Sequence, residues 1–169
     1  HGNTMIRTPR LDQLARQSVR LTNFHVDPTC AETRSALMTG KYSCRVGVWH
    51  TILGRSILRR DEKIMPQYFA EAGYRTGMFG KWHLGDNYPL RAQDQGFQET
   101  LTIRGGGLGQ PSDPPGGDHY TDATMYRNGK AVKTKGYCSD VFTDAAIEFI
   151  AANKDKPFFA YVPFNAPHG

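Results

Sequence analysis

The amino-acid sequence predicts an α/β fold in which a largely parallel sheet is flanked by helices. Helical patterns alternate with short apolar runs along the chain, and glycine or proline bounds most of these runs. One run, residues 157–164, is apolar almost throughout. A strand of this kind is typical of a parallel sheet that is covered on both faces. These observations favour alternating helix and strand units over an all-helical or all-strand domain.

The chain is expected to open with a helix and then a strand. Thr8 is a common type of N-cap, and Pro9 fits the first helical position. Leu11 and Leu14 follow at helical spacing. Residues 19–26 then form the first predicted strand, which leads toward a short polar turn.

Residues 30–40 are predicted to form a second helix, which starts directly after that turn. Leu37 and Met38 would face the core, and a glycine is placed to end the helix. Cys30 would lie in the first turn, where the helix dipole and free N–H groups suit an anion. Arg34 would follow one turn later on the same side. On this stretch alone, a packed cysteine followed by a surface arginine is the favoured interpretation.

Two further helix and strand pairs complete the predicted pattern. A helix that begins at Pro66 leads into a strand over residues 74–79. Ser139 and Asp140 would cap the last helix, whose apolar side chains recur at helical spacing. The apolar strand over residues 157–164 follows it.

Residues 104–137 are expected to form a loop and hairpin insertion. The first part is rich in glycine and proline, and no helix signal follows the glycines. A surface loop is therefore a stronger interpretation than a phosphate-binding loop. An Asn-Gly pair in the second part predicts a hairpin turn. The glycine-rich loop, residues 118–128 and the Trp49-His50 pair are candidates for the wall of a pocket.

Composition narrows the classes of partner. The formal net charge of +5 favours an anionic partner, but Lys and Arg are scattered, which suggests a small anionic substrate rather than nucleic acid. No window is long and apolar enough for a transmembrane helix. Three cysteines without CxxC spacing argue against zinc. Cys44 and Cys138 could pair in an exported protein, or all three thiols could be reduced. The chain lacks an initiator Met and is expected to be an internal fragment.

Three chemically distinctive stretches follow predicted strands. They are Cys30 with Arg34, Lys81 with His83, and His168. Because ligands of α/β sheets bind where parallel strands end, these stretches are expected to meet in one cleft. Two side chains that are two residues apart on an extended segment point the same way, so Lys81 and His83 would act together. Each residue alone is as easily a surface or structural side chain. Together they suit a tetrahedral anion whose ester oxygen is protonated on leaving.

The motifs around these residues resemble those of the type I sulfatases, in the alkaline-phosphatase-like superfamily. Residues 30–40 resemble the Cys-x-Pro-Ser-Arg signature that runs on to Leu-x-Thr-Gly. Residues 80–85, Gly-Lys-Trp-His-Leu-Gly, match the second signature, and residues 157–168 resemble the strand that presents a third site. The resemblance implies an α/β/α sandwich. Residues 1–169 would be part of a single catalytic domain, truncated at both ends.

The resemblance also implies a role for each site residue. A formylglycine-generating enzyme would oxidise Cys30 to formylglycine, whose hydrate is the nucleophile. Arg34 would hold the hydrate, Lys81 and His168 would bind sulfate oxygens, and His83 would orient the hydrate or shuttle its proton. A calcium ion (Ca2+) would bind the modified Cys30, with its remaining ligands outside these residues.

The implied function is hydrolysis of sulfate monoesters, either as an arylsulfatase or as a carbohydrate sulfatase. The partner would be a sulfated small molecule or glycan, in a periplasmic, secreted or lysosome-like compartment. Two alternatives stay open: a phosphodiesterase or phosphonate hydrolase of the same fold, and a catalytically silent binder of sulfated glycans. Glu32 and Thr33 replace the Pro-Ser of the signature, and the change from serine to threonine is mild. The second alternative follows from Glu32, because a Cys30 that the maturing enzyme does not recognise would stay a thiol.

Overall fold

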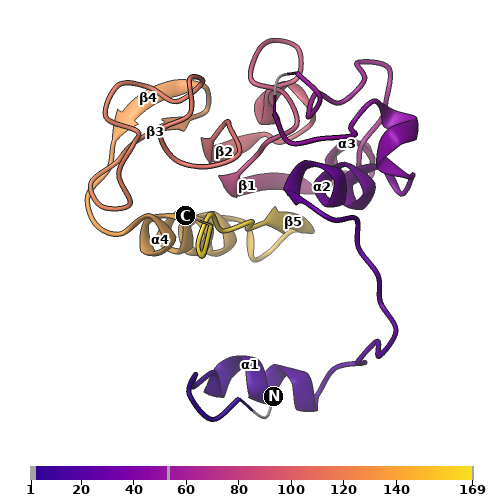
Figure 1. The fold of residues 1–169 in the computed structure, drawn as a ribbon. Helices are drawn as coiled ribbons and strands as arrows, with labels where there is room; N and C mark the ends of the chain where they lie inside the picture. Colours follow the sequence, from indigo (N-terminus) through magenta and orange to yellow (C-terminus); the bar gives the residue numbers. More distant parts are fainter. Residues whose placement is uncertain (1–2, 53, 169) are drawn as a thin grey trace.

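A five-stranded sheet forms the centre of the protein (Figure 1). The computed structural model describes residues 3–52 and 54–168, so residues 1, 2, 53 and 169 of the expected domain lie outside it. The strands are β1 (Arg75–Lys81), β2 (Glu99–Ile103), β3 (Thr124–Arg127), β4 (Lys130–Lys133) and β5 (Phe158–Tyr161). Their spatial order is β4-β3-β2-β1-β5. The β1 strand pairs in parallel with β2 and β5, and β3 and β4 add an antiparallel hairpin, which confirms the α/β class and the predicted hairpin.

Four α-helices and two short 3-10 turns are found in the described part of the chain. They are α1 (Pro9–Arg16), α2 (Cys30–Thr39), η1 (Ser43–Val46), α3 (Met65–Glu71), η2 (Ala92–Asp94) and α4 (Cys138–Asn153). Between residues 3 and 168, apart from residue 53, no helix has the length and apolar character needed to cross a bilayer. The α2 and α3 helices lie on one side of the sheet and α4 on the other (Figure 1).

The central strand β1 builds a core on each face of the sheet. Successive side chains of a strand point to opposite faces, so Met78 and Phe79 enter different cores. Met78 packs in a cluster with Trp82 and residues of α2, whereas Phe79 packs with residues of α4, including Phe149. All of these side chains are almost fully buried. Burial on both faces holds the end of β1 in one position, which matters because the site begins there.

Gly80 brings the chain after β5 against the end of β1. Its φ of +144° is a conformation that side-chain-bearing residues rarely adopt, and an added Cβ would lie 2.1 Å from the Pro163 carbonyl oxygen. The next residue, Lys81, donates its backbone N–H to that same oxygen at 2.8 Å. The segment that carries His168 is therefore tied to the segment that carries Lys81 and His83.

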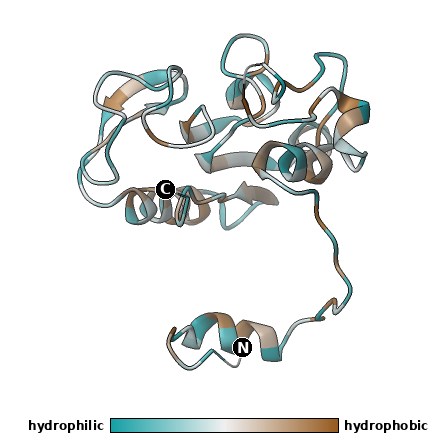
Figure 2. Ribbon diagram, viewed as in Figure 1, coloured by the Kyte–Doolittle hydropathy of each residue, from teal (hydrophilic) through white to brown (hydrophobic). Residues whose placement is uncertain are grey.

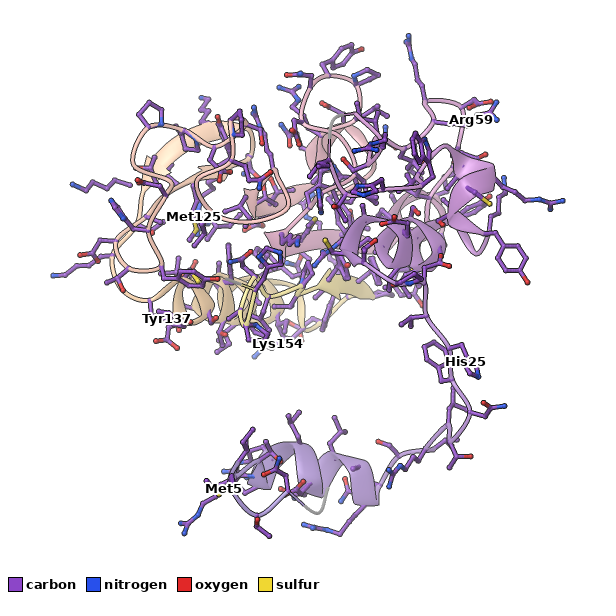
Figure 3. All side chains as sticks on the ribbon, viewed as in Figure 1. Met5, His25, Arg59, Met125, Tyr137 and Lys154 are labelled. Carbon is purple, nitrogen blue, oxygen red and sulfur yellow. The ribbon has the colours of Figure 1, made fainter. Side chains whose placement is uncertain are left out.

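The predicted strand over residues 19–26 is wrong. These residues form an extended connection between α1 and α2, which stands apart from the body of the protein in Figure 1. Figure 2 shows hydrophobic stretches along this connection, and Val19 is 90% exposed. In Figure 3, His25 lies on this connection and Met5 lies before α1, and both are apart from the body of the protein. A strand needs a neighbour for its backbone N–H and C=O groups, and no described strand lies beside this one.

Two details of the predicted helices also need correction. Leu37 is 50% exposed rather than inward, because α2 buries the face that carries Ala31, Ser35 and Met38. The last helix begins at Cys138, before the predicted Ser-Asp cap, and its N-cap makes no side-chain hydrogen bond. The first helix does carry proline at its start as expected.

The sheet contains one strand that the sequence did not predict and one that is less buried than expected. The residues of β2 alternate polar and apolar side chains between β1 and the hairpin, and no strand was predicted there. The β5 strand lies at the end of the sheet and pairs on one side, with β1. Its four residues are half-buried, so the expected burial on both faces is wrong.

Candidate active site

A tight turn delivers Cys30 to the first position of α2. Thr29, which precedes it, has a φ of +70°, a strained value for a residue other than glycine. Its hydroxyl donates a hydrogen bond to the Glu32 carboxylate, and the Thr33 hydroxyl donates to the Asp27 carbonyl at 2.5 Å. Glu32, which replaces the proline of the family signature, is buried in the first turn of α2 and accepts the hydrogen bond from Thr29. Its acidic side chain suits the positive end of the helix.

His83 holds the Cys30 sulfur on one side. The Cys30 Sγ and His83 Nδ1 atoms are 3.3 Å apart, and His83 Nε2 lies 2.7 Å from the Thr51 carbonyl oxygen. A carbonyl oxygen only accepts, so Nε2 carries the proton and Nδ1 is free to accept one from Cys30. Burial lowers the pKa of His83, and the Lys81 and Arg34 charges lower it further, against the hydrogen bond to Thr51. The imidazole is therefore a neutral acceptor at neutral pH.

Lys81 places a buried positive charge beside the same sulfur. The residue is 2% exposed, at the end of β1, and its ammonium group is within hydrogen-bonding reach of Cys30. Burial lowers the pKa of Lys81, an effect that Cys30 opposes and Arg34 reinforces. A cation that has lost most of its water interacts strongly with an anion nearby. The surroundings of Cys30 therefore favour negative charge.

Arg34 links α2 to the ends of two strands. Its Nη1 donates to the Lys81 carbonyl at 2.5 Å and to the Tyr161 hydroxyl at 3.4 Å. Burial lowers the pKa of Arg34, although Tyr161 and Cys30 act in the opposite direction. Arg34 Nε is buried and has no hydrogen-bond partner among the described residues. The guanidinium is thus held in place and retains a donor that an anion could use.

The insertion positions His168. Tyr120 donates its hydroxyl hydrogen to the His168 carbonyl oxygen and accepts a hydrogen bond from Asn165 Nδ2 at 2.8 Å. The Tyr120 ring stacks on Tyr137 with ring centroids 5.8 Å apart. Gly107, from the same insertion, approaches the His168 ring so closely that a Cβ would lie 3.3 Å from Nδ1. His168 itself is exposed.

These side chains surround an anion pocket of about 400 Å³. Its lining includes Cys30, His83, His168, Thr29, Thr51 and Gly106. The predicted convergence of Cys30, His83 and His168 is thus seen in the structure, although no strand precedes Cys30. Lys81 and Arg34 lie behind the pocket wall rather than on it. The extended segment assumed for Lys81 and His83 is wrong, because His83 has a φ of +62°.

Gly106, in the glycine-rich loop that was predicted as a pocket wall, does line the pocket, but sequence reasoning missed how tightly this loop packs. Gly105, Gly106 and Gly107 are buried rather than part of a surface loop. A Cβ on Gly106 would lie 2.6 Å from His83 Cε1, so this residue has to be glycine for the imidazole to fit. Three consecutive glycines at a strand end are a signal of close backbone approach. Of the other proposed wall segments, neither Trp49-His50 nor residues 118–128 line the pocket as far as the structure describes it.

The described residues do not form a metal site by themselves. In residues 3–52 and 54–168, no three His, Cys, Asp or Glu side chains gather where they could hold an ion. Calcium prefers several oxygen ligands, whereas the side chains around Cys30 supply sulfur, imidazole nitrogen and positive charge. Cys30, Cys44 and Cys138 are all unpaired.

An anion pocket at the carboxyl ends of parallel strands, with an imidazole and a buried ammonium at one sulfur, fits a protein that binds esters of a tetrahedral anion. Comparison with known proteins identifies the family within this class. A sequence model of the Sulfatase family matches residues 1–169, and the chain belongs to that family.

Individual relatives give the same result. The chain is 32% identical to N-acetylglucosamine-6-O-sulfatase of Bacteroides thetaiotaomicron over 99% of its length and 27% of the relative. It is 34% identical to mouse arylsulfatase J, over 99% of the chain and 29% of the relative. A solved structure in complex with its substrate D-glucosamine-2-N,6-O-disulfate matches with a TM-score of 0.76 and 31% identity, over 99% of this chain and 31% of that one. The chain thus spans under a third of these proteins.

Proposed function

We propose that the protein containing this chain hydrolyses sulfate monoesters and that Cys30 provides its nucleophile. The observation that carries the proposal is the contact of Cys30 with His83 inside an anion pocket backed by Lys81. Two relatives support the proposal, since one is named N-acetylglucosamine-6-O-sulfatase and the other arylsulfatase J. The chain covers 27% and 29% of these two relatives, so their substrates are not assigned to it directly.

Each site residue of this chain would have its own role in the reaction. A formylglycine at position 30 supplies a hydrated aldehyde, with one hydroxyl to attack sulfur and one to release sulfate afterwards. His83 Nδ1, which now faces the sulfur, would accept the nucleophile's proton. Lys81 would stabilise the negative charge that develops, and His168 would bind a sulfate oxygen from the opposite wall.

Several parts of this proposal come from the family resemblance. They are oxidation of Cys30 by a formylglycine-generating enzyme, a calcium ion whose oxygen ligands lie outside the described residues, and an exported compartment. A buried ammonium and a neutral imidazole beside residue 30 suit an oxygen nucleophile as well as a thiol, so they agree with the first part without selecting it.

Mass spectrometry of the tryptic peptide over residues 21–34, from protein made in its native host, tests the proposal. We expect this peptide to lack an alkylatable thiol, and the same preparation to hydrolyse para-nitrophenyl sulfate faster than para-nitrophenyl phosphate. Cys30→Ala should abolish hydrolysis. Cys44→Ala, a change at an exposed thiol that does not line the pocket, should leave hydrolysis unchanged. An intact Cys30 thiol without hydrolysis would contradict the mechanism.

A catalytically silent binder of sulfated glycans is the second candidate. Glu32 favours it, because the residue at the signature proline is here an acid hydrogen-bonded to Thr29. The two functions separate clearly: a silent binder keeps its Cys30 thiol and still binds inorganic sulfate in the anion pocket. Preferential turnover of a phosphodiester, bis-para-nitrophenyl phosphate, would instead support the phosphodiesterase of the same fold.

A further inference from the structure

A second hollow of about 540 Å³, here called the side pocket, adjoins the anion pocket. The two share Thr51, Ile52, His83 and Gln110 in their walls. Because His83 contacts Cys30 on the anion-pocket side, a molecule whose sulfate reaches Cys30 would extend past the imidazole into the side pocket. The side pocket is therefore in the place where the remainder of a sulfate ester would lie.

The sign of the charge changes between the two pockets. Lys81 and Arg34 stand behind the anion pocket. Of the described residues that line the side pocket, only Asp86 carries a full charge. Asp113, whose neighbours Pro111 and Ser112 line this pocket, lies close enough to Asp86 to sense its charge. One end of the combined cavity thus suits an anion, and the other end disfavours one.

The side pocket also carries groups that hydrogen-bond hydroxyls. Asn87, Gln110 and Ser112 line it beside Asp86. The Ser112 hydroxyl oxygen and Asp113 Oδ1 are buried without a hydrogen-bond partner in the part of the chain that is described. Buried polar atoms without partners are costly, so a ligand that supplies donors gains free energy by satisfying them. Tyr88, a residue that is 73% exposed, adds an aromatic ring on which a sugar ring could stack. The Arg91 guanidinium lies over the same ring, 5.9 Å from its centroid.

We propose that the leaving group of the sulfate ester binds in the side pocket. Asp86 makes this pocket select a sugar ring that carries hydroxyl or amino groups and no second anionic group. A carboxylate accepts hydrogen bonds from hydroxyls and attracts an ammonium group, whereas it repels a further sulfate or a uronic carboxylate. This inference rests on the proposed function. It narrows the substrate class from sulfate esters in general to monosulfated, neutral or amino sugars.

Burial raises the pKa of Asp113 to about 6, backbone N–H groups of Gln110, Arg104 and Gly109 oppose this, and the Asp86 charge adds to it. Asp113 itself does not line the side pocket, so Asp86 is the carboxylate on which the selectivity depends.

The test compares three sugar sulfates on the whole protein that contains this chain. They are glucosamine 6-sulfate, glucose 6-sulfate and glucosamine 2-N,6-O-disulfate. Turnover is measured for each, or the dissociation constant if no turnover occurs, with inorganic sulfate as a probe of the anion pocket. We expect glucosamine 6-sulfate to be preferred over the disulfate by about tenfold or more, which corresponds to about 1.4 kcal/mol.

Asp86→Asn should reduce that preference to near equality and leave binding of inorganic sulfate unchanged. The matched control is Asp61→Asn, a change at an exposed carboxylate that lines neither pocket. Unchanged ratios in Asp86→Asn, with inorganic sulfate still bound, would overturn the subsite and leave the proposed function standing. Selective binding without turnover would uphold the subsite and contradict the proposed function. Loss of all binding, inorganic sulfate included, would overturn both.

Discussion

The end of β1 and the N-terminal segment behave differently within one chain. From Thr76 to Gly85, a stretch that includes the sulfatase-like motif, every residue is buried, whereas α1 has no buried residue. The α1 helix forms nonetheless, because its hydrogen bonds lie within the segment. Residues 19–26 do not form a strand, because strand hydrogen bonds need a second segment.

This contrast separates the information held in local sequence from the information held in contacts. A helix start with proline and spaced leucines is enough for α1. The position of Lys81 and His83 instead depends on the cores on both sides of β1 and on the approach of Pro163. The chemically important residues lie in the second kind of region, so the strongest experiments change contacts there.

Gly80→Ala should have the largest effect on the buried region. The added Cβ would meet the Pro163 carbonyl oxygen at 2.1 Å, and the φ of +144° adds strain. We expect a loss of more than about 4 kcal/mol in the free energy of unfolding, measured by urea denaturation. Gly73→Ala is the control, because Gly73 also has a positive φ (+84°) but open space around it. A cost of about 1 kcal/mol is expected there, and similar losses for both variants would contradict the importance of the Pro163 contact.

Gly106→Ala should damage the site more than the fold. Its Cβ would lie 2.6 Å from His83 Cε1, so the imidazole has to move away from Cys30. A displacement of this size should lower kcat/KM for the sulfate ester by about 100-fold. Gly107→Ala, whose Cβ would lie 3.3 Å from His168, should lower it much less. Equal losses in the two variants would show that loop rigidity, not the position of His83, is responsible.

Tyr120→Phe tests whether the insertion positions His168. The substitution removes the hydroxyl that contacts His168 and Asn165 but keeps the stack on Tyr137. We expect KM to rise by about fivefold with a smaller change in kcat, because the loss of one hydrogen bond to His168 weakens binding by about 1 kcal/mol. Tyr137→Phe keeps both hydrogen bonds and should leave KM unchanged. A fall in kcat alone would assign His168 to proton transfer rather than sulfate binding.

Asp113→Asn should change how stability depends on pH. The raised pKa of about 6 means that the folded state holds a proton that the unfolded state, at an ordinary pKa of 3.8, has already released. Stability of the natural chain therefore falls as pH rises from about 4 to about 6, and the substitution removes this loss. We expect the Tm of the variant, relative to the natural chain, to increase by a few degrees across that window. Asp118→Asn, at an exposed carboxylate of the same loop, is the matched control.

Leu14→Ala should have the smallest effect, because it changes the exposed region. Leu14 is 59% exposed on α1, and alanine is a strong helix former. In the 169-residue chain we expect a change within about 0.5 kcal/mol in the free energy of unfolding. Leu101→Ala, at a residue that is 2% exposed in β2, should cost about 2–5 kcal/mol. A large loss from Leu14→Ala would show that α1 packs against the body of the protein in solution.

Local sequence predicted the fold class, the hairpin, and three of the four helices to within two residues at their starts. It also singled out five candidate site residues, Cys30, Arg34, Lys81, His83 and His168, whose roles stay predictions. These features depend on local spacing, turn residues and short motifs, which lie within a few positions of one another. The family, too, is readable from the Gly-Lys-Trp-His-Leu-Gly stretch at residues 80–85. The convergence of Cys30, His83 and His168 required one general rule, that parallel strands end at the same edge.

Only the tertiary structure decided how those residues are held. The glycines after β2 look like a surface loop until they are seen against the His83 and His168 rings. Tyr120 is 48 residues from His168 in the chain, and Thr51 is 32 residues from His83. Local patterns carry no record of such distant contacts. The same reason explains the failed strand over residues 19–26, since pairing is a property of two segments and a sequence pattern describes one.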